Sequence, residues 1–186
     1  MNNKILTIII VVVFFIATTW YVLTKNSLTP KESSQVGALV SQNESQAGAT
    51  LRLVPSKGSI GVGESFFIDV DLTSKEKIAA VDVSILFDQS KLELIDVSPG
   101  SFFTNAQPFS KKIDQAKGEA FYAVGSLAPK GGTGTLARFE FTGRQPGDSV
   151  IVELDDRTVV SSTETEGSVS VVLPVKSSIQ IVPVSQ

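Results

Sequence analysis

Residues 78–100, IAAVDVSILFDQSKLELIDVSPG, indicate two β-strands joined by a tight turn. In the first strand apolar residues alternate with a mixed set, so one row of side chains faces a core and the other faces outward. The core row is Val81, Val83, Ile85 and Phe87, and the outward row is Ala80, Asp82, Ser84 and Leu86. The turn is expected at 88–91, where the Asp88 carboxylate accepts nearby backbone N–H groups. A second apolar run follows, and Pro99-Gly100 ends it.

The sequence from Thr50 onward keeps this pattern, with short runs of alternating apolar and polar residues between clusters of Gly, Pro, Asp and Ser. Such spacing is typical of an antiparallel sandwich, and we expect about nine strands. Further core positions are expected at Leu51, Leu53, Phe67, Val70, Leu72, Ala137, Phe139 and Phe141. The rings of Phe102, Phe103 and Phe109 are expected to plug one end of the sandwich. Residues 126–134 are expected to form a long flexible loop, and residues 163–167 an exposed acidic turn.

The composition of the 186-residue chain excludes several classes of function. The chain has no cysteine, which rules out disulfides and thiolate metal sites, and no histidine, which removes the commonest general base and zinc ligand. The net charge of −3 offers no basic surface for nucleic acid. No nucleophile motif is present, so we predict that the chain is not an enzyme and needs no cofactor.

The N-terminal residues 5–23, ILTIIIVVVFFIATTWYVL, contain no charge. As a helix this segment would be about 28 Å long, close to the hydrocarbon core of a bilayer at about 30 Å. We predict a retained single-pass signal anchor over residues 1–24, with the bulk of the chain outside the cell membrane of a prokaryote; a cleaved signal peptide is the alternative. Residues 25–48 are polar and without period, which is typical of a flexible linker, and residues 49–184 are the predicted sandwich domain.

Two motifs of the sandwich carry a family resemblance. The first is Phe87-Asp88 followed by Leu92-Glu93-Leu94 and the stop Val97-Ser98-Pro99-Gly100, and the second is GTLARFEF at 134–141. Together with the order and spacing of the strands over residues 49–184, they resemble the cohesin domain. The resemblance implies a nine-stranded antiparallel jelly-roll β-sandwich that serves as a receptor for dockerin modules in cellulosomes or on cell surfaces. It also implies that calcium is carried by the dockerin-like partner and not by this chain.

The resemblance places the partner-binding face on the outward row of residues 80–86. Cohesins have an Asp at the position of Asp82, within an Asn-x-Asp pattern in which this chain has Ala80 in place of Asn. We extend the predicted face to the strand GEAFYAVG at 118–125, in which Phe121 and Tyr122 point to opposite sides. A flat face with an apolar centre and a polar rim suits a protein partner, and a merely solvated sheet face is the alternative. The predicted partner-binding residues are therefore Ala80, Asp82, Ser84, Leu86, Tyr122 and Val124.

Two groups of carboxylates are candidates for a metal site or a catalytic pair. The set Asp148, Glu153, Asp155 and Asp156 offers oxygen ligands for calcium, but it lacks the spacing of a calcium loop and is better explained as a solvated turn. Asp69 and Asp71 share one face of a strand, as a pair of glycosidase carboxylates would, but nothing in the sequence indicates a cleft between them. We therefore assign no metal site and no catalytic residue.

Two other functions stay open. Several polysaccharide-binding modules share the jelly-roll architecture, yet the chain's one Trp lies in the apolar N-terminal segment and Tyr122 is the only Tyr after residue 48. That scarcity argues against stacking of aromatic rings on cellulose. The second alternative is a structural protein of the cell envelope, because a fold does not by itself determine a function.

Overall fold

The computed structural model describes residues 48–183, and these residues form strands and turns without a helix. The strands are β1 (Ala49–Val54), β2 (Lys57–Gly61), β3 (Ser65–Phe87), β4 (Leu92–Pro99), β5 (Gln107–Asp114), β6 (Glu119–Gly143), β7 (Gly147–Leu154), β8 (Val159–Ser162), β9 (Ser168–Val169) and β10 (Val175–Val182). The all-β sandwich is confirmed, with the strands numbered to ten where nine were expected. Over residues 48–183, no helix is long and apolar enough to cross a membrane. The predicted anchor at 5–23 lies outside the described residues.

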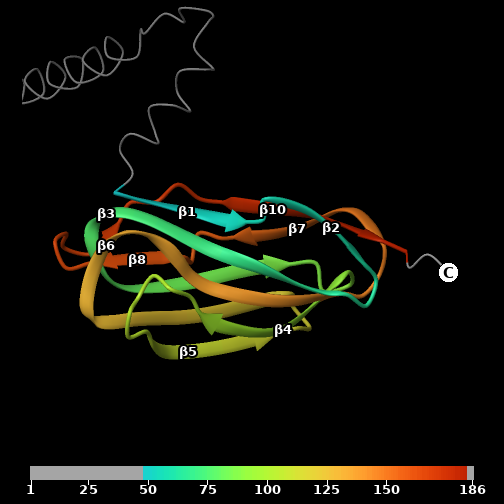
Figure 1. The fold of residues 1–186 in the computed structure, drawn as a ribbon, viewed down its shortest axis with the longest axis horizontal. Coiled ribbons are helices and arrows are strands. Elements are labelled where there is room, and N and C mark those ends of the chain that lie inside the picture. The colour runs from blue at the N-terminus through green and yellow to red at the C-terminus, as the bar shows by residue number, and fades with distance from the viewer. Residues whose placement is uncertain (1–47, 184–186) are drawn as a thin grey trace, which may run out of the picture. The chain divides into compact units, whose positions relative to one another are not determined.

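Two long strands, β3 and β6, contribute to both layers of the sandwich (Figure 1). They pair antiparallel from Ser65 opposite Thr142 to Leu86 opposite Glu119. The register shifts between Val70 and Asp71 and again between residues 74 and 80. Such bulges bend a strand pair without ending it. One part of each strand therefore belongs to one layer and the other part to the second layer.

We call the layer formed by β5, residues 119–125 of β6, residues 80–87 of β3, and β8 the front sheet. We call the layer formed by β4, residues 132–143 of β6, residues 65–74 of β3, and β1 the back sheet. β10 pairs parallel with β2 and antiparallel with β7. Residues 152–154 of β7 also pair with residues 85–87 of β3, which connects this group to the front sheet. The parallel β2–β10 pair departs from the fully antiparallel sandwich that was predicted.

The hydrophobic core lies between the two layers. It contains the predicted row of β3 and most of the other predicted positions: Leu51, Leu53, Val70, Leu72, Val81, Val83, Ile85, Phe87, Ala137, Phe139 and Phe141. The ring of Phe141 stacks at 5.7 Å on Phe66 and meets Phe87 edge-on at 5.4 Å, both favoured arrangements of aromatic pairs. Burial of these apolar side chains is the main stabilisation of the domain.

One predicted core position, Phe67, and one predicted plugging ring, Phe109, are wrong. Phe67 is 48% exposed on the outer surface of the back sheet, where the guanidinium of Arg138 lies 5.2 Å from the centre of its ring. Strict alternation from Val70 puts Ile68 inward in its place, and Ile68 is fully buried. Of the three rings expected to plug one end, Phe102 and Phe103 are buried and meet edge-on at 5.0 Å, whereas Phe109 is exposed.

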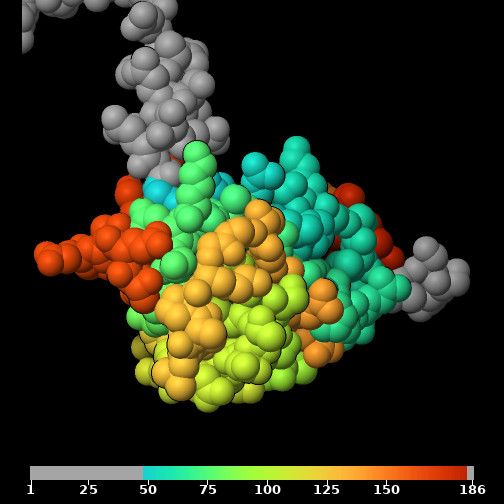
Figure 2. Space-filling model, turned by 60° about the vertical axis from the view of Figure 1, so that its left-hand side comes forward, coloured from blue at the N-terminus to red at the C-terminus, as the bar shows by residue number. Residues whose placement is uncertain are grey.

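The predicted turns and loops have mixed outcomes. The turn at 88–91 is confirmed, since Asp88 Oδ1 accepts the Ser90 N–H at 2.9 Å and the Ser90 hydroxyl at 2.6 Å. The loop expected at 126–134 is instead part of β6, because Lys130, Gly132 and Gly134 pair with residues 78, 74 and 72 of β3. Residues 163–167 are exposed as predicted, and the connection between β8 and β9 projects from the domain (Figure 2).

Candidate binding face

The outer surface of the front sheet brings together the outward row predicted on β3. Residues directly opposite in an antiparallel pair point to the same side of a sheet. The row Ala80, Asp82, Ser84 and Leu86 therefore shares this surface with its opposite residues on β6, which are Gly125, Ala123, Phe121 and Glu119. β5 extends the surface with Ser110 and Lys112, and β8 adds Val159 opposite Asp82. We call the surface formed by these residues the front face.

Two residues predicted for this face, Tyr122 and Val124, lie in the core instead. Tyr122 is 1% exposed and Val124 is fully buried, because they lie opposite the core residues Val83 and Val81. The row of β6 that faces outward begins with Glu119. That charge is the signal available in the sequence, since a carboxylate belongs on the solvated row of a strand that is buried on one side only.

Asp82 lies near the middle of the front face. Its side chain is half-buried, and within residues 48–183 its carboxylate has no hydrogen-bond or ion-pair partner. The residues opposite it, Ala123 on β6 and Val159 on β8, carry no side-chain donor. Because an ionised carboxylate only accepts hydrogen bonds, Asp82 is available to a donor from outside the domain.

Ser84 belongs to the front face by register but is only 2% exposed, because the chain after β7 folds over it. The Asp155 N–H donates to the Ser84 carbonyl at 3.2 Å, and the Ser84 N–H donates to Thr158 Oγ1 at 3.1 Å. Arg157 Nε donates to Asp155 Oδ2 at 2.8 Å, and Arg157 Nη1 lies 3.4 Å from Glu119 Oε2. Burial raises the pKa of Asp155, but hydrogen bonds from Arg157 and Ser84 outweigh it and leave the pKa below its ordinary value of 3.8. Arg157 is therefore the residue that this part of the front face presents to solvent.

The front face also includes Phe109, which simple alternation along the sequence does not assign to it. A register shift between Pro108 and Ser110 leaves Phe109 without a partner on β6, and its side chain is 66% exposed. The ring lies over Gly125, since a Cβ placed on Gly125 would be 2.7 Å from Phe109 Cε2 and 3.1 Å from the Cβ of Ala80. Pro108 is the available signal, because proline within a strand marks an edge or a bulge.

A pocket of about 300 Å³ lies at the end of the front face away from Phe109. Three cations, Lys112, Lys117 and Arg157, line it around Phe121. Lys117 lies 3.3 Å from Asp114, and Arg157 is paired as described above. Lys112 has no ion-pair partner among residues 48–183. The front face therefore has an apolar end around Phe109, a free carboxylate at its middle and an unpaired lysine at its other end.

Four of the six carboxylates considered for chemistry, Asp69, Asp71, Glu153 and Asp155, have structural partners. In the part of the chain that the structure describes, no three acidic side chains are grouped so that they could hold a metal ion. Glu153 lies 2.9 Å from Lys176. On the back sheet, Asp69 accepts two hydrogen bonds from Arg138 at 2.7 and 2.8 Å, and Asp71 accepts one from Thr135 at 2.8 Å.

Comparisons with known proteins give a family and a fold for this chain. The family model of the Cohesin domain matches residues 52–181. A non-cellulosomal cohesin from the hyperthermophilic archaeon Archaeoglobus fulgidus is similar with a TM-score of 0.60 and 18% identity, over 73% of this chain and 92% of that one. The third cohesin ScaC of Acetivibrio cellulolyticus, solved in complex with the ScaB dockerin, is similar with a TM-score of 0.61 and 15% identity, over 72% and 99%.

A cohesin–dockerin complex of Clostridium thermocellum, Coh-OlpA with Doc918, gives a further match. Its TM-score is 0.60 at 11% identity, over 72% of this chain and 99% of that one. At such identities the structural matches show the fold alone. The search of curated proteins gave no match to this chain.

Proposed function

Because this chain belongs to the cohesin domain family, we propose that it is a non-catalytic recognition module whose front face binds a dockerin-like module of another protein. Asp82 carries the proposal, since its carboxylate lies between apolar neighbours and has no partner within residues 48–183. A donor group of a bound protein would satisfy it. Two of the similar solved structures, from Acetivibrio cellulolyticus and Clostridium thermocellum, are complexes of a cohesin with a dockerin.

The make-up of the front face supports a protein ligand. Protein interfaces combine apolar anchors in their core with a polar rim. Ala80 and the exposed ring of Phe109 supply the apolar part, and Lys112 and Arg157 supply charges at the rim. The face lies on a sheet backed by the core, so few groups need to be ordered when a partner binds.

Ala80 distinguishes this face from the binding face of the cohesin pattern. The cohesin pattern has Asn at this position, and its replacement by Ala removes a hydrogen-bonding group beside Asp82. Phe109 lies against the same spot, over Gly125. The partner in this proposal therefore presents an apolar side chain opposite Ala80 and Phe109, and a hydrogen-bond donor opposite Asp82.

The proposal also states where the domain is located and which molecule carries calcium. Residues 5–23 anchor the chain in the cell membrane, and residues 25–48 hold the domain on the extracytoplasmic side, at a root-mean-square span of about 25–30 Å. Calcium is carried by the partner, because this ion needs about six to eight oxygen ligands. The acidic side chains of residues 48–183 are not grouped for such a site.

An affinity capture tests the proposal. The full chain, in a non-ionic detergent, is immobilised and exposed to secreted and surface proteins of its own organism, first with calcium and then with a chelator. We expect a calcium-dependent partner that Asp82→Arg no longer retains. Glu140→Arg is the matched control, since it makes the same change of charge opposite Phe67 on the back sheet. Retention by Asp82→Arg, or loss with Glu140→Arg alone, would exclude the front face as the site.

Phe109 favours a second candidate ligand, a polysaccharide. An exposed aromatic ring on a flat surface is the feature that sugar rings stack on. Phe109→Ala should then abolish retention of the chain on an insoluble polysaccharide, whereas Phe67→Ala, which removes an exposed ring from the back sheet, should leave it unchanged. Equal retention of the wild type, Phe109→Ala and Phe67→Ala would rule out ring stacking at Phe109.

A further inference from the structure

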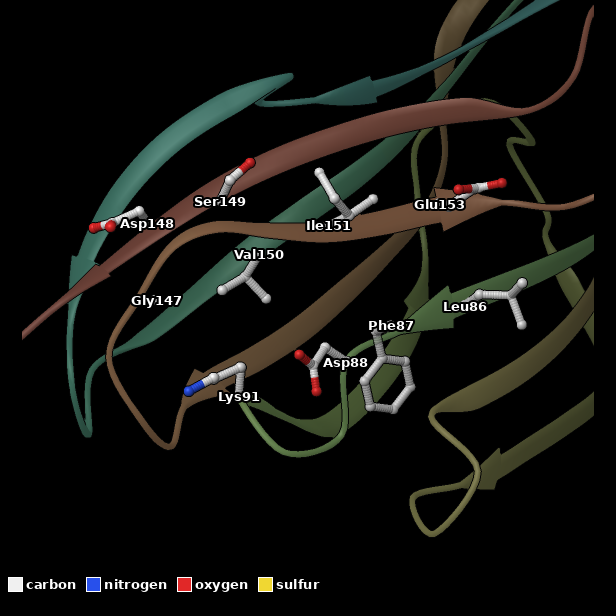
Figure 3. A pocket seen from close by; sticks show the side chains of 10 residues that line it. All are labelled: Leu86, Phe87, Asp88, Lys91, Gly147, Asp148, Ser149, Val150, Ile151 and Glu153. Carbon is white, nitrogen blue, oxygen red and sulfur yellow. The ribbon is translucent and has the colours of Figure 1, made fainter.

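A groove of about 430 Å³ lies outside the proposed dockerin site, between the turn after β3 and the first half of β7 (Figure 3). Asp88 and Lys91 line it from the turn, and residues 147–151 line it from β7. Leu86 and Glu153 line it where β3 and β7 are paired with each other. Leu86 is the one lining residue that the groove shares with the front face.

One edge of β7 is free along this groove. On one side β7 pairs with β10, from Gly147 opposite Ile181 to Leu154 opposite Val175. On the other side only residues 152–154 are paired, with residues 85–87 of β3. β3 ends at Phe87 and the chain turns away, so residues 147–151 have no strand on that side within the part of the chain that is described. An unpaired strand edge is a ready template for another strand, and its length here, at about 3.4 Å per residue, is about 17 Å.

The side chains around this edge favour a basic ligand. Asp88 and Asp148 are two carboxylates of the lining, and Lys91, whose charge acts on Asp88, is the only cation that residues 48–183 contribute to it. Glu153 also lines the groove but lies 2.9 Å from Lys176, which offsets its charge. Hydrogen bonds from Ser90 lower the pKa of Asp88 and keep it ionised at neutral pH. Exposed apolar surface comes from Ile151 and in part from Leu86, whereas Phe87 and Val150, which also line the groove, are buried.

We propose that this groove binds an extended peptide segment of a partner protein, with alternating basic and apolar residues, which adds as a short strand to the free edge of β7. The backbone of residues 147–151 pairs with the backbone of the peptide, as in other cases of recognition by strand addition. Because successive side chains of a strand point to opposite faces, the apolar row of the peptide lies on the face of Ile151 and the basic row lies on the face of Asp148.

A designed probe tests this site on the full chain in a non-ionic detergent. The probe is the peptide acetyl-Lys-Val-Lys-Val-Lys-amide with a fluorophore, followed by fluorescence anisotropy. We expect saturable binding that Asp148→Lys weakens by about tenfold or more, since like charges then face each other. Asp156→Lys is the matched control, because it makes the same change at an exposed residue outside the groove.

A second pair of peptides separates strand addition from simple charge attraction. The same peptide with N-methylated valines keeps its charge but loses backbone donors, and it should bind at least about tenfold more weakly. Hydrogen exchange should show slower exchange at residues 147–151 when the unmodified peptide is bound. Absence of saturable binding, equal binding of the N-methylated peptide, or protection confined to the front face would each overturn the proposal. None of these results depends on whether the front face binds a dockerin.

Discussion

Replacing Tyr122 with phenylalanine is expected to stabilise the domain. The ring of Tyr122 is buried in the core opposite Val83, and its hydroxyl is buried without a hydrogen-bond partner among the described residues. An unsatisfied buried polar group destabilises a fold by about 1–3 kcal/mol. Tyr122→Phe removes this group and keeps the ring, so the free energy of unfolding should rise by about 1 kcal/mol. For a domain of this size that corresponds to an increase in Tm of about 4 °C.

Tyr122→Ala provides the contrast. Removing a large buried ring costs about 3–5 kcal/mol in other proteins, because transfer energy is lost and a cavity remains. Both variants are measured by urea denaturation of the full chain in detergent, with the slope of the transition checked for two-state behaviour. If Tyr122 lay on the front face, as its sequence neighbourhood suggested, both changes would fall within about 0.5 kcal/mol of the wild type. That outcome would refute the register of β3 and β6 described above.

The wild type and Tyr122→Phe should also differ in how their stability changes in alkaline solution. Burial, and to a smaller extent the charge of Asp96, raises the pKa of Tyr122 above its ordinary value of 10.0. A group whose pKa is raised by folding stabilises the fold below its unfolded pKa and loses that contribution as the pH rises through its folded value. The stability of the wild type should therefore fall above about pH 10 relative to Tyr122→Phe. A constant difference between the two proteins across that range would contradict a buried phenol.

Two further predictions concern the frame of the front face. Gly118 has φ +67, and a Cβ there would collide with the Phe87 carbonyl oxygen, whereas Gly167 has φ +94 and open space around it. Gly118→Ala should therefore cost about 2 kcal/mol or more in urea denaturation and Gly167→Ala about 1 kcal/mol; equal costs would contradict the close approach. Arg157→Ala should cost about 1 kcal/mol at pH 7 by freeing Asp155. Folding lowers the pKa of Asp155 below 3.8, so this difference should disappear as the pH falls through that folded value, and its persistence in acid would contradict the pairing.

Local sequence chemistry was sufficient for the hairpin around residues 78–97. Four apolar residues of β3 alternate with a mixed row, and the Asp88 carboxylate accepts the N–H of Ser90 within the same turn. The continuity of β3 and β6 was not predictable in this way. The polar residues 73–77 and the glycines at 131, 132 and 134 are ordinary loop signals. They stay in strands because these two segments, far apart in the sequence, pair with each other.

The residues of the front face could also be predicted only in part from the sequence. The row on β3 is clear from its own alternation, but GEAFYAVG is largely apolar on both sides, so only pairing with β3 decides that Phe121 faces outward and Tyr122 inward. The bulge that exposes Phe109 lies in an edge strand, where the pattern of one strand does not show which residue is left unpaired. The burial of Ser84 depends on Asp155 and Thr158, which approach from a distant part of the chain.

The central claim is that the front face, and not the back sheet, binds a protein partner. The most direct measurement is the dissociation constant of the captured partner, in calcium, for the wild type and the variants Asp82→Arg, Phe109→Ala and Glu140→Arg. Truncation of a buried aromatic anchor costs about 2 kcal/mol or more at an interface, which is about thirtyfold in the dissociation constant. We predict losses of about that size for Asp82→Arg and Phe109→Ala, with unchanged stability, and no loss for Glu140→Arg. Unchanged binding by both front-face variants, or a comparable loss for Glu140→Arg, would contradict the account.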